Sequence, residues 1–248
     1  VPLSEVSGYN FAIKNVGKVE SKGFEVSLGA TLIKSDSFTW RSNINWSSDR
    51  SVVQELDPNN PELEFTQQVA SNPFIIDRVN QRRGQIYSKT ARRFVYDPQI
   101  HNSSLQQYNG MMYHDSAKDL PRVAELSVIG NVNPDWIAGW ENNFTYKGWS
   151  LGALVTSVYG NSFYAGFEKD FVGDGFDPIT AGDRSSVLPD GIWDSPTGIR
   201  PFAPGDEITA DQYYGDYLTD GEINDIWVRD GSYVKIKEVS LSYSLPSK

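Results

Sequence analysis

The sequence predicts an all-β protein: a section of an antiparallel transmembrane β-barrel that carries long extracellular loops. Three observations lead to this prediction: runs with a two-residue hydrophobic period, aromatic residues repeated at both ends of those runs, and a regular alternation of short and long connections. The sequence contains no apolar run of about 20 residues, the length of a membrane-spanning helix. Any crossing of a bilayer would therefore be made by strands.

The clearest strands form a hairpin over residues 136–159, with a turn at 147–148. Most alternate residues in each run are apolar and opposed by polar residues or glycine, which is typical of a strand with water on one side. The apolar positions are Trp136, Ala138, Trp140, Phe144 and Tyr146 in the first run, and Trp149, Leu151, Ala153, Val155 and Tyr159 in the second.

Aromatic residues mark both ends of each run. Trp136 and Tyr146 lie ten residues apart, as do Trp149 and Tyr159, so each pair spans roughly 33 Å of strand. At a tilt of about 40° the rise is roughly 25 Å, the height of the apolar band between the aromatic girdles of an outer-membrane barrel. A soluble β-sandwich with aromatic strands explains this hairpin equally well when it is taken alone.

Three more strands have the same character. They are expected over residues 19–34, from 38 to about 50, and over 233–245, with a tight turn at 35–37. Lys235 and Lys237 share the parity of Val239 and Leu241, and because lysine is costly at the bilayer midplane, both are expected at the extracellular rim. The apolar positions are Phe24, Val26, Leu28, Ala30, Leu32, Phe38, Trp40, Ile44, Trp46, Val239, Leu241, Tyr243 and Leu245.

The connections then favour the barrel over the sandwich. Those at 35–37 and 147–148 are tight, whereas 57–133 and 160–232 are long, so short and long ends alternate as the chain goes up and down. Outer-membrane barrels show this asymmetry, with short periplasmic turns and long extracellular loops. The segment 57–133 is too long for a structureless loop, and we expect it to hide two strands or to be a functional excursion.

Composition excludes several classes of function. The net charge of −10 and the pI of about 4.7 argue against a nucleic-acid partner. The absence of cysteine excludes a disulfide framework and thiolate metal sites. The first ten residues have neither the basic nor the apolar region of a signal peptide, so we expect a chain that was processed or cut from a longer one.

Three blocks of the sequence carry a resemblance to a known family. They are NVGKVESKGFE (15–25), GNVNPDWI (130–137) with NFTYKG (143–148), and SYVKIKEVSLSYSLP (232–246). In this order, they resemble the C-terminal barrel region of SusC/RagA-type TonB-dependent outer-membrane transporters. The resemblance covers most of the chain outside the two long excursions, and it implies a 22-stranded barrel with an N-terminal plug in the outer membrane of a Gram-negative bacterium. It also implies uptake of glycan or peptide fragments with a SusD-like surface lipoprotein as lid and TonB as energy source.

Residues 1–248 would then be the C-terminal section of the receptor barrel. The plug, the final strands and the TonB-contacting N-terminal part are expected to lie outside this chain, and no catalysis is expected within it. Members often carry a Gly-rich aromatic segment and an acidic loop where this chain has 83–88 and 119–124. That departure argues against a divalent-ion site at this place.

Three sets of side chains are the candidate functional residues. From parity alone, Arg41, Asn43, Asn45, Glu141, Asn143 and Thr156 are expected to face the lumen, and Trp40, Trp46, Trp136, Tyr146, Trp149, Tyr159 and Tyr243 to form the membrane girdle. The loop aromatics Trp193, Tyr213, Tyr214, Tyr217 and Trp227 would contact substrate or lid, or would pack the loops against each other.

Other chemistry is not favoured. His101 and His114 lie in an irregular region and suit a surface or loop role better than a metal site. Five aspartates between 170 and 190 could bind a divalent ion, but they lack the ligand spacing of an EF-hand, and no cofactor is expected. The alternatives are a soluble secreted β-sandwich carbohydrate-binding module and, with scattered carboxylates as its only support, a β-rich glycoside hydrolase.

Overall fold

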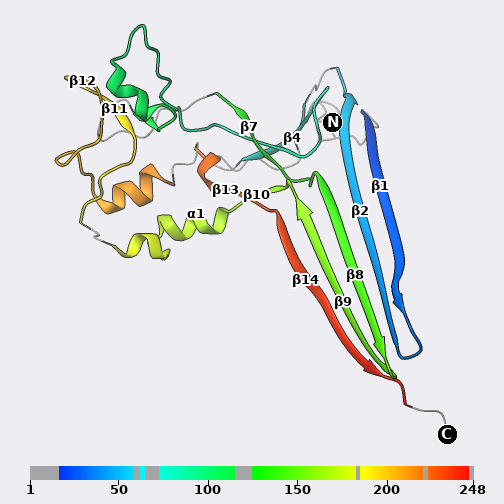
Figure 1. Cartoon of the computed structure of the whole chain (residues 1–248). Helices are drawn as coiled ribbons and strands as arrows, with labels where there is room; N and C mark the ends of the chain where they lie inside the picture. The colour runs from blue at the N-terminus through cyan, green and yellow to red at the C-terminus, as the bar shows by residue number, and fades with distance from the viewer. Residues whose placement is uncertain are drawn as a thin grey trace, which may run out of the picture.

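A five-stranded antiparallel sheet dominates the fold (Figure 1). The computed structural model describes residues 17–58, 62–64, 73–114, 125–182, 185–219 and 223–245. The sheet contains β1 (Lys18–Lys34), β2 (Phe38–Glu55), β8 (Trp136–Tyr146), β9 (Trp149–Tyr159) and β14 (Tyr233–Tyr243), paired in that order. The predicted hairpins and closing strand are confirmed, although β2 extends beyond residue 50 and β14 ends before Leu245.

Both short turns lie at one end of the sheet, the lower end in Figure 1, and the long excursions lie at the other. At the β1–β2 turn, the Ser35 N–H donates to the Phe38 carbonyl over 2.8 Å. At the β8–β9 turn, Lys147 and Gly148 both have positive φ, 45° and 87°, the conformation of a type I′ hairpin turn. The alternation of short and long connections is therefore confirmed.

The first excursion, residues 57–133, contains more regular structure than the two strands predicted. β3 (Glu62–Glu64), β4 (Phe74–Arg78), β5 (Gln85–Ser88) and β7 (Ser127–Asn131) form a four-stranded antiparallel sheet. A 3₁₀ helix, η2 (Ser103–Tyr108), and the short strand β6 (Tyr113–His114) follow β5. Residues 119–124, which departed from the family pattern, lie outside the described residues.

The second excursion folds against the first. β10 (Ser162–Tyr164) pairs with β13 (Val228–Asp230), and β11 (Ile192–Ser195) joins β12 (Gly198–Pro201) and β6 in one small sheet. Between them lie α1 (Gly166–Gly173), two 3₁₀ helices, η3 (Pro178–Ala181) and η5 (Asp225–Trp227), and the π-helical turn η4 (Gln212–Tyr217). We call the two excursions together the loop layer. No helix among the described residues is long and apolar enough to span a membrane.

The buried core lies in the loop layer. Phe94, Tyr113 and Ile192 form its centre, with Tyr96, Leu105, Tyr108 and Ile199 packed around them. Of the described residues in the five long strands, only Val53 and Asn142 are buried. Except at the loop end of β2, the long sheet therefore packs neither of its faces against the rest of the described chain. This does not fit a β-sandwich, since its two sheets pack face to face.

Two β-bulges change which side chains share a face. In β1 the register shifts between Thr31 and Ile33, so Ile33, and not Leu32, lies opposite Trp40. In β14 it shifts between Ile236 and Glu238, which places Lys235 opposite Thr156. The prediction that Lys235 shares the face of Val239 was wrong, because one extra residue in a strand reverses the parity of all residues beyond it. Lys237 is the residue that the pairing skips.

The positive φ of Gly148 predicts a large cost for a side chain there. An added Cβ would lie 3.2 Å from the Tyr243 ring, and the new residue would have to keep the left-handed backbone conformation. We expect Gly148→Ala to destabilise the protein by about 1 kcal/mol or more, measured as a lower urea midpoint of unfolding. Gly139→Ala is the matched control, since nothing lies within 4 Å of its Cβ position. Equal midpoints for the two variants would contradict the turn conformation.

Candidate functional site

The six residues predicted to face a lumen do share one face of the long sheet. Cross-strand pairs place Arg41 opposite Asn143, and Asn43 opposite Glu141. The amide groups of Asn143 and Asn43 donate to the two Glu141 carboxylate oxygens, over 2.8 Å and 3.4 Å. We call this the polar face. That it lines a lumen stays a prediction.

The remaining members complete the polar face. Asn45 and Thr156 both lie opposite Gly139. The Thr156 hydroxyl is buried without a hydrogen-bond partner among the described residues. The bulge in β14 brings Lys235 next to Thr156, where its ammonium lies 4.9 Å from the centre of the Tyr233 ring. Lys235 therefore lies on the polar face, whereas its parity in the sequence had predicted the apolar face.

The seven girdle residues all lie on the opposite face, which we call the apolar face. At the turn end, Tyr146, Trp149 and Tyr243 form a row across three strands, and Trp40 stacks on Phe144 with ring centres 5.5 Å apart. At the loop end, Trp136 stacks on Tyr159 at 5.4 Å, and Trp46 lies opposite Ala138. The two aromatic rows are therefore roughly 33 Å apart along the strands.

The large side chains of the apolar face are uncovered among the described residues. Examples are Trp149, which is 50% exposed, and Val234, which is 74% exposed. A contiguous exposed apolar surface of this kind marks an interaction with a membrane or a partner.

The loop aromatics divide into two groups. Trp193 and Trp227 are buried, Trp193 stacked on Phe202 and Trp227 donating its indole N–H to the Leu218 carbonyl over 2.9 Å. They pack the loop layer and leave little surface for a ligand. Tyr213 and Tyr214 are half-buried, with ring centres 5.1 Å apart. The side chain of Tyr217 lies outside the described part.

Tyr214 lines a cavity of about 250 Å³ that also includes Asp174 and Asp211. Its hydroxyl donates to the Ile179 carbonyl over 3.0 Å. Burial raises the pKa of Tyr213 above its ordinary value, with Tyr214 and Asp190 adding to the shift. That this aromatic pair contacts a ligand or lid stays a prediction.

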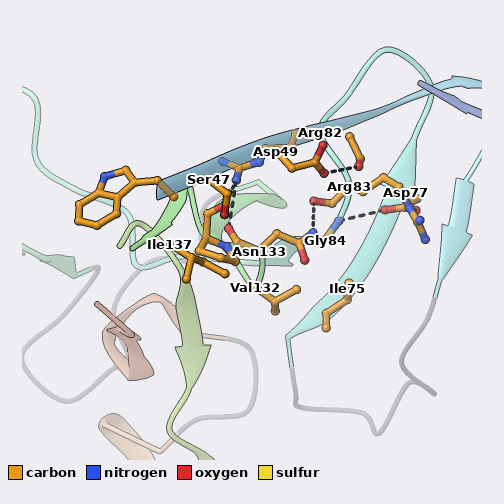
Figure 2. A pocket seen from close by; sticks show the side chains of 13 residues that line it. Ser47, Asp49, Ile75, Asp77, Arg82, Arg83, Gly84, Val132, Asn133 and Ile137 are labelled. Carbon is orange, nitrogen blue, oxygen red and sulfur yellow. Dashed lines mark hydrogen bonds and ion pairs between the residues drawn. The ribbon is translucent and has the colours of Figure 1, made fainter. Parts of the chain in front are cut away.

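Sequence reasoning missed a larger cavity, of about 480 Å³, between β2 and the β4–β5 hairpin (Figure 2). From β2 it is lined by Ser47, Asp49 and Ser51, which belong to the polar face. From the hairpin, Arg83 donates to the Asp77 carboxylate over 2.7 Å. The sequence shows Arg82 and Arg83 as a basic pair, but only the fold brings them next to β2.

The 130–137 block forms the joint between the long sheet and the loop layer. The Arg82 guanidinium pairs with the Asp135 carboxylate and donates to the carbonyls of Asn133 and Pro134, over 3.1 and 2.8 Å. Ser48, on β2, donates its hydroxyl to the Asp135 carbonyl over 2.6 Å. We call these contacts the Arg82 joint.

Glycine is required beside this joint. Gly84 has a φ of 75°, and a Cβ there would lie 2.5 Å from the Asn133 amide nitrogen. Gly160, with a φ of 84°, packs in the same way against the Asp135 carboxylate. The two glycines therefore let the backbone approach Asn133 and Asp135 closely.

The two histidines have structural roles in the loop layer. His114 is fully buried and packs edge-on against Phe202, and His101 accepts the Asp97 N–H at Nδ1 over 3.0 Å. Asp177 accepts the Ile179 N–H to begin η3, and Asp183 lies outside the described residues. Within the described ranges, no three His, Asp or Glu side chains gather as a metal site would require.

Comparison with known proteins finds relatives of this chain, although no family model matches the sequence. Three curated proteins of Formosa agariphila are similar along almost the whole chain: TonB-dependent receptor P26 (26% identity, 99% of the chain), P39 (24%, 98%) and P3 (26%, 99%). The chain spans only 24–26% of the length of these relatives.

Solved structures agree. The RagAB peptide transporter superposes with a TM-score of 0.57 at 14% identity, and the RagAB peptide importer in its open-open state with 0.60 at 15%. Each match covers 99% of this chain and about a quarter of the other. The resemblance to SusC/RagA-type TonB-dependent receptors is confirmed. The barrel-section fold and the outer-membrane location that this resemblance implies are confirmed with it.

The Arg82 joint predicts a local loss when its cation is removed. Arg82→Ala leaves Asp135 without its partner beside two carbonyls, and we expect a destabilisation of about 1–3 kcal/mol. The readout is a lower urea midpoint of the receptor, with faster proteolysis of the loop layer. Arg50→Ala, on an exposed position of the same β2 strand, should change neither. If Arg82→Ala behaves like Arg50→Ala, the joint does not hold the loop layer.

A second ion pair predicts a pH dependence. Asp206 accepts from both Arg200 terminal nitrogens, over 2.6 and 2.8 Å, and these bonds lower its pKa from 3.8 to about 2. The stabilisation is therefore present above pH 3.8 and is lost as the pH falls towards 2. We expect pepsin to cleave residues 198–206 slowly at pH 4 and much faster near pH 2. Asp206→Asn should be cleaved quickly at both pH values. If the variant is cleaved as slowly as the wild-type protein at pH 4, the ion pair does not protect this segment.

Proposed function

We propose that this chain forms a wall section of an outer-membrane importer that takes up glycan or peptide fragments in a TonB-dependent manner. The observation that carries the proposal is the two-faced sheet: one face uncovered, apolar and bounded by aromatic rows, the other polar. Similarity to TonB-dependent receptors along the chain supports it. Neither those relatives nor the solved neighbours are named as enzymes, which supports the expectation that the chain has no catalytic role.

The orientation follows from the two ends of the sheet. Short turns lie on the periplasmic side of an outer-membrane barrel and long loops outside, so the loop layer is extracellular and the turns at 35–37 and 147–148 are periplasmic. The apolar face contacts lipid with its girdle residues at the two membrane interfaces. The polar face, including Arg41, Glu141 and Asn143, lines the lumen.

A cargo would meet the loop layer first. A SusD-like surface lipoprotein would cover it as a lid, and Tyr213 and Tyr214 are the aromatic residues placed to contact that lid or the cargo. TonB would act on the plug in the N-terminal part of the receptor, outside this chain. The cavity between β2 and the β4–β5 hairpin lies at the loop end of the polar face, where cargo passes from the loops into the lumen.

Peptide and oligosaccharide both remain candidate cargoes. The solved neighbours are named as a peptide transporter and a peptide importer. In this chain, the polar face presents carboxylates and amides that can pair with the backbone of a peptide or the hydroxyls of a sugar.

A cysteine pair tests the orientation, because the chain contains no cysteine of its own. Ser27 and Leu28 are exposed neighbours on β1 that point to the polar and the apolar face. In the full-length receptor in cells, we expect a water-soluble maleimide to label Ser27→Cys and to leave Leu28→Cys unlabelled, since hydrocarbon excludes the reagent. Equal labelling of the two positions would contradict the proposed lumen.

Uptake tests the function itself. Cells that lack the receptor should lose uptake of the radiolabelled peptide or oligosaccharide pool on which they grow, and collapse of the proton gradient in wild-type cells should give the same loss. Normal uptake in the deletion strain would disprove import by this protein.

A further inference from the structure

Two polar side chains lie in the middle of the apolar face. Ser42 and Asn142 are cross-strand partners on β2 and β8, and Asn142 lies four residues from Tyr146 in one aromatic row and six from Trp136 in the other. Polar groups in hydrocarbon are costly unless they are hydrogen-bonded. The Trp140 indole N–H donates to the Ser42 hydroxyl over 2.9 Å, and the Trp40 indole N–H donates to the Asn142 amide oxygen over 3.0 Å.

These short side chains belong to a furrow that crosses the strands. Cross-strand pairing aligns Ala30, Ser42, Asn142 and Ala153 in one row. The flanking rows are larger: Leu28, Ile44, Trp140 and Val155 on one side, and Ile33, Trp40, Phe144 and Leu151 on the other. The two indoles reach into the furrow from opposite sides.

Where the furrow meets β1 it opens into a hollow of about 470 Å³. Its lining consists of Leu28, Gly29, Ala30, Leu32, Trp40, Ser42, Ile44 and Trp140. Both indole N–H groups are already bonded to Ser42 and Asn142, so they offer no donor to an occupant. The walls present aliphatic and aromatic carbon, which is complementary to hydrocarbon.

We propose that this hollow binds one acyl chain of an outer-membrane lipid as a discrete site, which we call the acyl site. The inference rests on the proposed orientation of the apolar face towards lipid. The hollow opens on that face, between the aromatic rows, so the molecules beside it are lipid chains. Hydrocarbon fits its lining, whereas a lipid head group or a polar segment of another protein would leave its hydrogen bonds unmade.

Photolabelling tests the acyl site in the full-length receptor. The receptor is reconstituted in phosphatidylethanolamine vesicles that contain a phospholipid with a diazirine halfway along one acyl chain, and adducts are mapped by mass spectrometry. Residues 28–44 are compared with β14, whose Val234, Ile236 and Leu241 are all at least 67% exposed on the same face. Lipid that merely surrounds the barrel would label β14 at least as strongly. A bound chain should label 28–44 severalfold more.

Filling the hollow should abolish that excess. Ala30→Phe, and the milder Ala30→Leu in case the first variant folds poorly, should reduce labelling of 28–44 to the level of β14. Ala153→Phe is the matched control, because Ala153 lies in the same row but outside the hollow lining, and it should keep the excess. Folding of each variant is checked by the heat-dependent gel mobility of the barrel.

The other outcomes separate the two proposals. Equal labelling of both segments in the wild type, or an excess that survives Ala30→Phe, would overturn the acyl site and leave the orientation intact. Weaker labelling of 28–44 than of β14 would also overturn it, whether the cause is unbound surrounding lipid or another polypeptide over the hollow. Absence of label from both segments would overturn the orientation of the apolar face, and with it the proposed function.

Discussion

A strand inside a bilayer has no water to bond with, so each of its backbone N–H and C=O groups needs a partner on a neighbouring strand. In the long sheet, β2, β8 and β9 are paired on both sides, β8 and β9 along almost their whole lengths, and β1 and β14 form its two edges. Once the backbone is paired in this way, alternate side chains must face opposite surroundings. The apolar and polar faces follow from that geometry, and the core is left to the loop layer.

The two parts of the molecule differ in what stabilises them, and the Arg82 joint connects them. The long sheet depends on its backbone ladders and on surroundings outside the chain, whereas the loop layer buries Phe94, Tyr113 and Ile192 in a core of its own. Asp135 lies at the junction, held by Arg82 from the first excursion and by Ser48 from β2. In the proposed importer, this attachment would couple the contact of a lid or cargo with the loop layer to the barrel wall.

Departures from ideal alternation adapt each face to its surroundings. The bulge in β14 moves Lys235 away from the apolar face to lie beside Thr156, which avoids a lysine in hydrocarbon. On the apolar face, the polar pair Ser42 and Asn142 is tolerated because two tryptophan N–H groups bond to it. The same indoles wall the hollow at β1, so the residues that satisfy the polar pair also shape the surface that lipid meets.

The sequence by itself determined the long strands, their tight turns and the face of every candidate wall residue from Arg41 to Thr156, because a two-residue period is a local property of the chain. It did not determine the bulges at Leu32 and Lys237, since an extra residue becomes visible only against a paired strand. Nor did it place Trp193 and Trp227, which stacking and long-range contacts bury in the loop layer. The Arg82 joint, the cavity between β2 and the β4–β5 hairpin, and the hollow at β1 were likewise decided by the tertiary structure. Their residues are brought together from strands and loops far apart in the sequence.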